Sequence, residues 1–338
     1  VDRNKDGIVV RGAKLHITAA SLVHELVVMP TKGMRQDEKD YAVSFSIPVN
    51  TKGVSIINRS FAPAELNAFD YPASAHHSMP EGFVVFDDVF VPWDRVFLAG
   101  ETEEGGFLTT SYATHHRHSC IGARAGFGDL LIGAGALMID ANGLDTERHG
   151  HIREAMVELI TITESFFACG VAASVYGLKD PAGSIMPDTV FSNIGKLLLA
   201  TKIYDMHRLA HYVSGGLVVA LPGPDEDHNP ETQASLSAVL AGRPDIPAAQ
   251  RLEVARLIED LTASHQAGWY SMISLHGGGS PEAMKREIWR NYPVMEKREL
   301  VERLLDRGVL DEGQRVSKQP GRCCATGCEV PAIPTAAE

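Results

Sequence analysis

Cysteine is scarce in this chain, with five residues in 338, and three of the five crowd together at Cys323, Cys324 and Cys328. This count and spacing exclude the spread framework of a disulfide-stapled secreted domain, so a reducing, cytoplasmic location is expected. The three clustered thiols have no fourth ligand nearby, and we predict no metal site there.

Long apolar runs and a leader pattern are also missing. No stretch of eighteen uninterrupted apolar residues occurs, which predicts a chain that does not span a membrane. The opening residues, Val1 to Gly7, resemble a turn entering a strand, without an initiator Met or a signal-peptide pattern. We therefore expect the sequence to begin in the middle of a longer protein.

Positive charge is in short supply: 31 Lys and Arg residues stand against 43 Asp and Glu, for a formal charge of -12. Clustered Lys and Arg are what bind a phosphate lattice, so this balance argues against nucleic acid or an anionic membrane as the main partner. A small molecule or another copy of the chain is expected instead. The length and the 44% hydrophobic content are sufficient for one large or two ordinary globular domains.

Residues 1–104 have the character of an antiparallel β domain. Short β-rich runs alternate with turns of the Lys-Gly and Asp-Gly type, where glycine supplies the positive φ that a tight turn needs. The predicted strands are Ile8–Val10, Val27–Met29, Tyr41–Ile47, Val54–Ile57 and Phe83–Pro92.

Residues 105–316 change to apolar positions at three- and four-residue spacing, which is typical of helices. The predicted helices are 107–142, 150–178, 188–213, 247–275 and 281–308. Their apolar faces are broad, so we predict a four- or five-helix bundle and an α+β fold overall. The segment from Pro222 to about Pro247 is predicted to be an exposed excursion, and 317–338 an irregular tail.

The densest group of reactive side chains lies at residues 114–129. On a helix, His116 and Cys120 share one face, and Ala123 and Arg124 follow one turn later. An imidazole, a thiol and a guanidinium then face one pocket. A structural alternative is that the glycines and alanines here mediate tight helix packing beside satisfied histidines. His116 and Cys120 are also possible metal ligands, but two are too few, and no metal is assigned.

Two further motifs place polar groups in loops. Gly12–Ala20 combines Lys, His and Thr at the end of a strand, where exposed backbone can bind a heterocycle edge. Gly277–Gly279 precede Ser280-Pro281, and the free N–H groups of the helix beginning there favour an anion. Ser214-Gly215-Gly216 is a fainter case of the same pattern. The alternative for Gly12–Ala20 is an ordinary amphipathic loop. The alternative for the glycine motif before Pro281 is a common helix start.

These motifs together resemble the flavoprotein family that contains 4-hydroxyphenylacetate 3-hydroxylase and 4-hydroxybutyryl-CoA dehydratase, with a closer likeness to the dehydratase branch. The matching blocks run over most of the chain: Val1–Thr31, Asp40–Phe45, Val84–Pro92, His116–Gly133, Ser214–Pro222 and His276–Pro281. The resemblance implies an acyl-CoA dehydrogenase-like fold of a helical, a β and a second helical domain. This chain would hold the last two, in a homotetramer.

The resemblance also implies FAD, bound between the β domain and the bundle with contacts from a neighbouring subunit. Its contacts would be His16, Ile17, Thr18 and Ala19 on the β domain. The glycines Gly215, Gly216, Gly277 and Gly278 would lie near its phosphates or adenosine.

The family's dehydratase holds a [4Fe-4S] cluster through one His and three Cys, and here the pattern departs. His116 matches the His ligand, but Ala123 replaces a Cys ligand, and a methyl group cannot coordinate iron. The catalytic Lys and Tyr of the dehydratase correspond to Arg124 and Cys120. Arginine is effectively never deprotonated, so Arg124 is expected to hold an anion rather than to act as a base. A cluster-free enzyme is therefore expected.

The sequence accordingly predicts a FAD-dependent oxidoreductase, most similar to a two-component monooxygenase that receives reduced flavin from a separate reductase. The catalytic residues are expected to be His116 as acid, base or substrate anchor, Arg124 as anion clamp, and Cys120 beside them. The alternative is a dehydratase or vinylacetyl-CoA isomerase acting on a short acyl-CoA thioester. A third interpretation is a flavin-binding homologue without activity.

Overall fold

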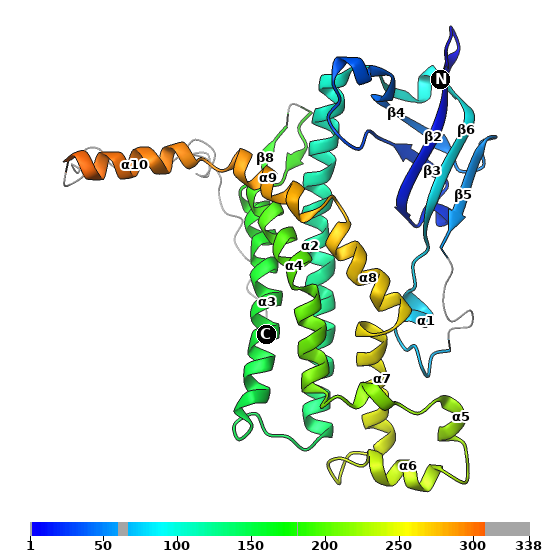
Figure 1. Ribbon diagram of the computed structural model, residues 1–338, viewed down its shortest axis with the longest axis vertical. Helices are drawn as coiled ribbons and strands as arrows, with labels where there is room; N and C mark the ends of the chain where they lie inside the picture. Colours follow the sequence, from blue (N-terminus) through cyan, green and yellow to red (C-terminus); the bar gives the residue numbers. More distant parts are fainter. Residues whose placement is uncertain (1, 60–66, 181, 308–338) are drawn as a thin grey trace, which may run out of the picture.

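The computed structural model describes residues 2–59, 67–180 and 182–307 (Figure 1). The predicted irregular tail, 317–338, lies outside the described residues together with Cys323, Cys324 and Cys328.

The N-terminal part of the chain forms two small antiparallel sheets. The first contains, in spatial order, β1 (Asp2–Arg3), β2 (Gly7–Thr18), β6 (Glu81–Pro92) and β5 (Val54–Asn58). The second contains, in spatial order, β3 (Glu25–Val28), β4 (Val43–Pro48) and β7 (Val96–Ala99). The antiparallel β fold predicted for this part is confirmed.

Alternating side chains from both sheets make one apolar core. Phe45 of β4 meets Phe86 of β6 edge to face, with ring centroids 5.8 Å apart. Buried and exposed side chains alternate along β6, but the alternation shifts by one residue between Phe86 and Val89, which are both buried. An extra residue accounts for the change, because β6 bulges there and Asp88 has a φ of 47°.

The C-terminal part is helical, and Figure 1 shows its three longest helices side by side. The helices of this part are α2 (Thr102–Ala141), α3 (Gly150–Val175), α4 (Thr189–Val213), α5 (Pro224–Asp227), α6 (Gln233–Leu240), α7 (Ala248–Thr262), α8 (His265–His276), α9 (Pro281–Asn291) and α10 (Val294–Arg307). A short helix, α1 (Ser74–His77), and a hairpin of β8 (Leu178–Lys179) and β9 (Ile185–Met186) complete the regular elements named here. The bundle core includes Leu131, Met138, Leu159, Phe166 and Leu199.

Two of the predicted helices are each divided in two, and both predictions were wrong in that respect. The segment 247–275 breaks at Ser264, whose hydroxyl accepts a hydrogen bond from the Ala267 N–H at 3.0 Å and so begins α8. The segment 281–308 breaks at Pro293, which cannot continue the hydrogen-bond ladder of α9. The excursion between Pro222 and Pro247 is largely exposed as predicted, although it contains α5 and α6.

The β sheets lie beside the N-terminal part of α2 (Figure 1). Gln36 Nε2 donates to Thr102 Oγ1 at 2.8 Å, and Thr109 Oγ1 donates to the Pro30 carbonyl at 3.3 Å. These contacts attach the β part to the helix that carries the predicted reactive residues.

Two helices, α2 and α3, are long and apolar enough to cross a membrane by length and composition alone. The search for uninterrupted apolar runs missed them because charged residues interrupt both, Arg124 and Asp129 in α2 and Glu158 and Glu164 in α3. Both helices contribute fully buried side chains to the bundle core, Leu131 and Met138 from α2 and Leu159 and Phe166 from α3. The core helices of a soluble protein pass the same test, so this is weak evidence for a membrane span.

Candidate functional site

The reactive residues predicted on α2 come together where that helix faces α4, α8 and the loop before α9. The Cys120 Sγ lies 3.5 Å from His116 Nδ1, as the four-residue spacing predicted. The Tyr112 ring flanks the same imidazole, with centroids 5.7 Å apart. A thiol and an imidazole therefore share one face of α2.

Arg124 is buried and held at two places by α8. Its Nε donates to Ser274 Oγ at 3.1 Å, and its guanidinium carbon lies 4.3 Å from the centre of the Tyr270 ring. Ser274 Oγ in turn donates to the Tyr270 carbonyl at 2.6 Å. In the described part of the chain, neither terminal nitrogen of Arg124 has a protein acceptor, so the fork is left for a planar anion.

Lys196 of α4 is a member of this site that the sequence prediction missed. Its side chain is wholly buried, and its ammonium donates to the Ser274 carbonyl. Burial lowers its pKa to about 8; Cys120 opposes that change and Arg124 adds to it. A signal was present, because Lys196 falls on the same helical face as the buried Leu199 and Ile203.

Arg117 connects α2 to α4 and to the glycine loop. Its Nε donates to the Gly278 carbonyl and its Nη1 to Asn193 Oδ1, both at 2.8 Å. The sequence prediction did not single out Arg117, whose buried guanidinium fixes the loop against the cluster.

The loop at Gly277 and Gly278 packs directly on His116. Gly278 has a φ of 73°, and a Cβ added there would lie 2.8 Å from His116 Nδ1. Both the conformation and the close approach require glycine at this position. Ser280 caps α9 by accepting from the Ala283 N–H at 3.3 Å. A flavin-phosphate role for Gly277 and Gly278 stays a prediction.

The electrostatic setting of His116 favours the neutral imidazole. Burial lowers its pKa below the usual 6.5, and the nearby cations Lys196, Arg124 and Arg117 lower it further. At neutral pH the ring therefore has one nitrogen able to accept a proton.

The predicted flavin-contacting segment, His16 to Ala19, lies at an irregular edge of β2. His16 and Ala19 have φ angles of 59° and 61°, and the register against β6 shifts between Lys14 and Ile17. Strand β1 pairs only with Ile8 and Val9, so in the described residues the rest of that edge of β2 has no strand partner. Unpaired backbone groups of this kind fit the hydrogen-bonding edge of a flavin.

The hydroxyl of Thr18, one of the predicted flavin contacts, already has a protein partner. Its Oγ1 donates to Glu81 Oε2 at 2.6 Å, and the same carboxylate oxygen accepts from Trp269 Nε1 at 3.3 Å. The hydroxyl is left as an acceptor only. Glu81 thereby connects the β2 edge to α8.

Gly215 and Gly216 lie far from the His116 cluster within one chain. They follow the end of α4 with φ angles of 71° and 75°, and a Cβ at either would have no described residue within 4 Å. From Lys196 to its end at Val213, α4 rises by roughly 26 Å at about 1.5 Å per residue. The structure therefore does not bring these glycines to the predicted catalytic residues.

The structural alternative for the glycines among residues 114–129 holds at one position. A Cβ at Gly128 would lie 2.4 Å from Thr163 Oγ1 of α3, so helix packing requires glycine there. No described residue lies within 4 Å of such an atom at Gly122 or Gly126, so packing within the described part of the chain does not explain them.

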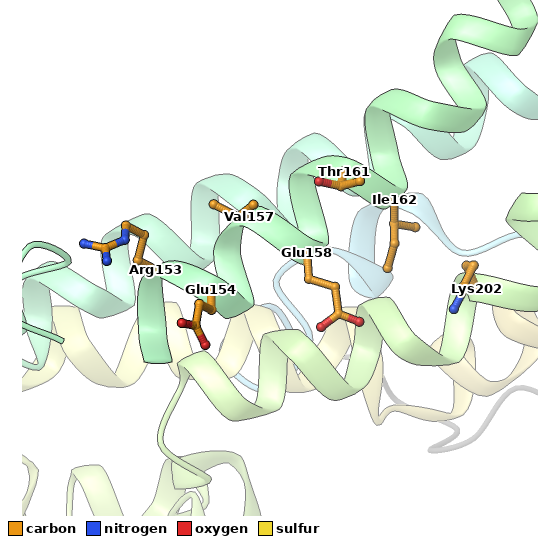
Figure 2. A pocket seen from close by; sticks show the side chains of 7 residues that line it. All are labelled: Arg153, Glu154, Val157, Glu158, Thr161, Ile162 and Lys202. Carbon is orange, nitrogen blue, oxygen red and sulfur yellow. The ribbon is translucent and has the colours of Figure 1, made fainter. Parts of the chain in front are cut away.

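Two surface hollows lie elsewhere on the described part of the bundle. One, of about 420 Å³, is lined by Arg153, Glu154, Val157, Glu158, Thr161, Ile162 and Lys202 (Figure 2). The other, of about 570 Å³, is lined by Tyr204, His207, Arg208, His211, Thr262, Gly268, Ser271 and Met272. Neither is lined by a predicted catalytic residue.

The order of two antiparallel sheets followed by a helical bundle is the acyl-CoA dehydrogenase-like arrangement that the resemblance implied. The structure of glutaryl-CoA dehydrogenase matches 84% of the chain with a TM-score of 0.54 at 14% identity, which shows the fold alone. The chain belongs to the 4-hydroxyphenylacetate 3-hydroxylase family: the family's N-terminal model matches residues 1–98 and its C-terminal model residues 106–306.

Relatives in this family include both a dehydratase and oxygenases. The chain is 34% identical over 313 residues to 4-hydroxybutyryl-CoA dehydratase/vinylacetyl-CoA-Δ-isomerase of Clostridium aminobutyricum, covering 89% of this chain and 63% of that protein. It is 26% identical over 321 residues to the 4-hydroxyphenylacetate 3-monooxygenase oxygenase component of Thermus thermophilus, covering 94% and 65%. The chain thus spans less than two thirds of the length of these relatives.

Solved structures show the same two branches. An oxygen-tolerant archaeal 4-hydroxybutyryl-CoA dehydratase from N. maritimus superposes with a TM-score of 0.84 at 33% identity, covering 94% of this chain and 63% of that one. An oxygenase component of 4-hydroxyphenylacetate 3-monooxygenase, complexed with FAD and 4-hydroxyphenylacetate, superposes with a TM-score of 0.83 at 24% identity, covering 91% and 64%.

Proposed function

We propose that the intact protein is a FAD-dependent enzyme that works without an iron–sulfur cluster and oxygenates an anionic aromatic or acyl substrate. Reduced flavin would come from a partner reductase, and the enzyme would act as a cytoplasmic homotetramer. The observation that carries this proposal is the arrangement of Arg124. Its guanidinium is fixed by Ser274 and Tyr270, and its terminal nitrogens remain available to a ligand.

The residues of this chain fit a flavin at the exposed edge of β2. Ile17 would hold its ring edge through backbone groups and Thr18 through its acceptor oxygen. Ala19 would contribute contact only, because its N–H donates to the Pro80 carbonyl at 2.8 Å and its carbonyl accepts from the Leu22 N–H at 2.9 Å. The glycines at 277–278, and those at 215–216 of another subunit, would lie toward its phosphates or adenosine. Bound FAD would supply two-electron redox chemistry and, when reduced, reaction with oxygen.

The protein's own residues would bind the substrate and move its proton. Arg124 would hold the substrate oxyanion by two parallel hydrogen bonds. The neutral His116 would accept a proton at Nε2, because Nδ1 faces the Cys120 thiol. The Tyr270 ring would keep water from the face of the Arg124 guanidinium that it covers.

The donor set does not fit the cluster of the dehydratase. Ala123 offers only its carbonyl, which accepts from the Tyr270 hydroxyl at 3.5 Å, and a methyl side chain replaces the sulfur ligand. Within the described ranges, no group of three or more His, Cys, Asp or Glu side chains is placed to hold a metal. No step is derived through iron.

The decisive experiment uses the full-length gene product, purified without oxygen. Its absorption spectrum and its iron and acid-labile sulfide content are measured, followed by oxygen uptake with reduced FAD and 4-hydroxyphenylacetate. We expect a flavin spectrum, no stoichiometric iron, and substrate-dependent oxygen consumption. A brown protein with about four irons per chain would contradict the proposal.

A second candidate is dehydration or isomerisation of an acyl-CoA thioester, which the 34% identity to the Clostridium enzyme favours. Conversion of 4-hydroxybutyryl-CoA or vinylacetyl-CoA by the same preparation would support it. A protein that binds FAD but turns over neither substrate class would instead be a flavin-binding homologue without activity.

A further inference from the structure

The strongest unassigned feature of the molecule is the buried ammonium of Lys196. Its neighbours along the same face of α4, Leu199, Ile203 and Met206, are all fully buried apolar side chains. A lysine at such a position is costly unless its charge is compensated. Its one described hydrogen bond goes to the Ser274 carbonyl, whereas an ammonium has three hydrogens to donate.

Among the described residues, no carboxylate forms an ion pair with that ammonium. The buried Arg256 shows the usual solution, since its Nη1 lies 3.1 Å from Asp70 Oδ1. Across residues 2–59, 67–180 and 182–307, by contrast, no ion pair joins a carboxylate to Lys196, Arg124 or Arg117. These cations also act on one another, because Arg124 and Arg117 both disfavour the charged form of Lys196. Glu287 favours the charged form of Arg117. Three cations against this one carboxylate leave an excess of buried positive charge in the cluster.

Ser274 accepts hydrogen bonds from two of these cations and so fixes their positions relative to each other. Its carbonyl accepts from Lys196, and its hydroxyl accepts from Arg124 Nε. The ammonium from α4 and the guanidinium from α2 are therefore anchored to one residue of α8. Such an arrangement brings a point charge and a planar fork to the same place, and together they suit an oxygen anion better than either does alone.

We propose that Lys196 is the second cation of the anion site around Arg124, and that the pair binds one organic oxyanion of the substrate, a carboxylate or a phenolate. The inference rests on the proposed function, because it assigns the substrate's charge to the same site. It extends that function in one respect: a neutral substrate of the same shape is rejected, since it leaves two buried cations uncompensated.

The test measures equilibrium binding to the full-length protein by calorimetry, with and without FAD. The probes are 4-hydroxyphenylacetate, phenylacetate, and the uncharged 2-phenylethanol, which can form neither a carboxylate nor a phenolate. Lys196→Met removes the charge and Lys196→Gln keeps a donor for the Ser274 carbonyl. Lys202→Met is the matched control, because Lys202 lies on the same helix with its side chain 47% exposed and pairs with Asp205.

We expect both Lys196 variants to weaken binding of the anionic probes by about tenfold or more and to leave binding of the uncharged alcohol unchanged. Binding of phenylacetate would identify the carboxylate as the bound oxyanion, and binding of 4-hydroxyphenylacetate alone would identify the phenolate. Anion binding equal to wild type in Lys196→Met and Lys196→Gln would overturn the inference, as would equal losses in Lys202→Met.

A second readout separates anion binding from a structural role. An uncompensated buried charge destabilises the ligand-free protein, so Lys196→Met is expected to melt at a higher temperature than wild type without ligand. A lysine needed only for packing would give the opposite shift. Failure of the proposed function gives a different result. If anion binding depends on Lys196 but the protein takes up no oxygen, only the monooxygenase reaction is contradicted.

Discussion

The guanidinium of Arg124 lies over the ring of Tyr270, 4.3 Å from its centre, and the two residues belong to different helices, α2 and α8. The ring supports one face of the cation while Ser274 holds its Nε. Because these contacts fix the orientation of the fork, little side-chain entropy remains to be lost when an anion binds.

Replacement of Arg124 tests the anion clamp directly. For Arg124→Ala, we expect KM for an anionic substrate to rise by one to three orders of magnitude, roughly 1.5–4 kcal/mol. Steady-state kinetics with reduced FAD measure the change. The exposed Arg208, which pairs with Glu158 at 3.1 Å, provides the control Arg208→Ala. An unchanged KM in Arg124→Ala would remove this residue from the site.

Gly278→Ala is expected to damage both stability and activity. The positive φ of 73° costs about 1 kcal/mol for alanine, and the added Cβ would also displace His116. Gly215→Ala is the matched control, because Gly215 has a φ of 71° but no neighbour among the described residues within 4 Å of an added Cβ. Chemical denaturation of both variants isolates the displacement; equal losses of stability would show that Gly278 and His116 are not in contact.

The pH dependence of activity is expected to report His116. Its lowered pKa keeps the ring neutral at pH 7, so kcat/KM should fall only when the pH drops below 6.5. Removing the positive charge in Lys196→Met should move that fall to higher pH, because Lys196 is among the cations that disfavour the protonated ring. Arg208→Ala should leave the profile where it is. An identical profile in Lys196→Met would contradict the electrostatic coupling.

The stability of the wild-type protein is expected to rise between pH 8 and 10.5. The folded protein releases the Lys196 proton near pH 8 while the unfolded chain still holds it, so the charge penalty disappears across this interval. Lys196→Met removes the penalty at every pH and should stabilise the protein at pH 7 by up to about 3 kcal/mol. Its advantage should shrink above pH 8. Urea denaturation across this range, with Lys202→Met as control, provides the measurement.

The parts of the site that depend on local spacing could be predicted from the sequence. His116 and Cys120 are one helical turn apart, and the structure confirms that their side chains meet. The contact of the glycine loop with His116 could not be predicted, because it joins positions more than 150 residues apart and depends on how α8 packs against α2.

Lys196 escaped prediction for a different physical reason. A single lysine in an apolar helical segment usually extends its stem along the surface and exposes its charge. Only the packing of α4 against α2 and α8 shows that its ammonium remains inside. The bulge at His16 was missed similarly, since register against β6 is not encoded in the local pattern.

The helix α8 also reaches the β sheets, through the hydrogen bond from Trp269 to Glu81. Trp269, Tyr270 and Ser274 all belong to this one helix. A small rotation between the sheets and the bundle would shift Arg124 and Lys196 together, because Ser274 of α8 anchors both. Binding at the edge of β2 and binding of the anion should therefore be thermodynamically coupled, so that each ligand raises the affinity for the other.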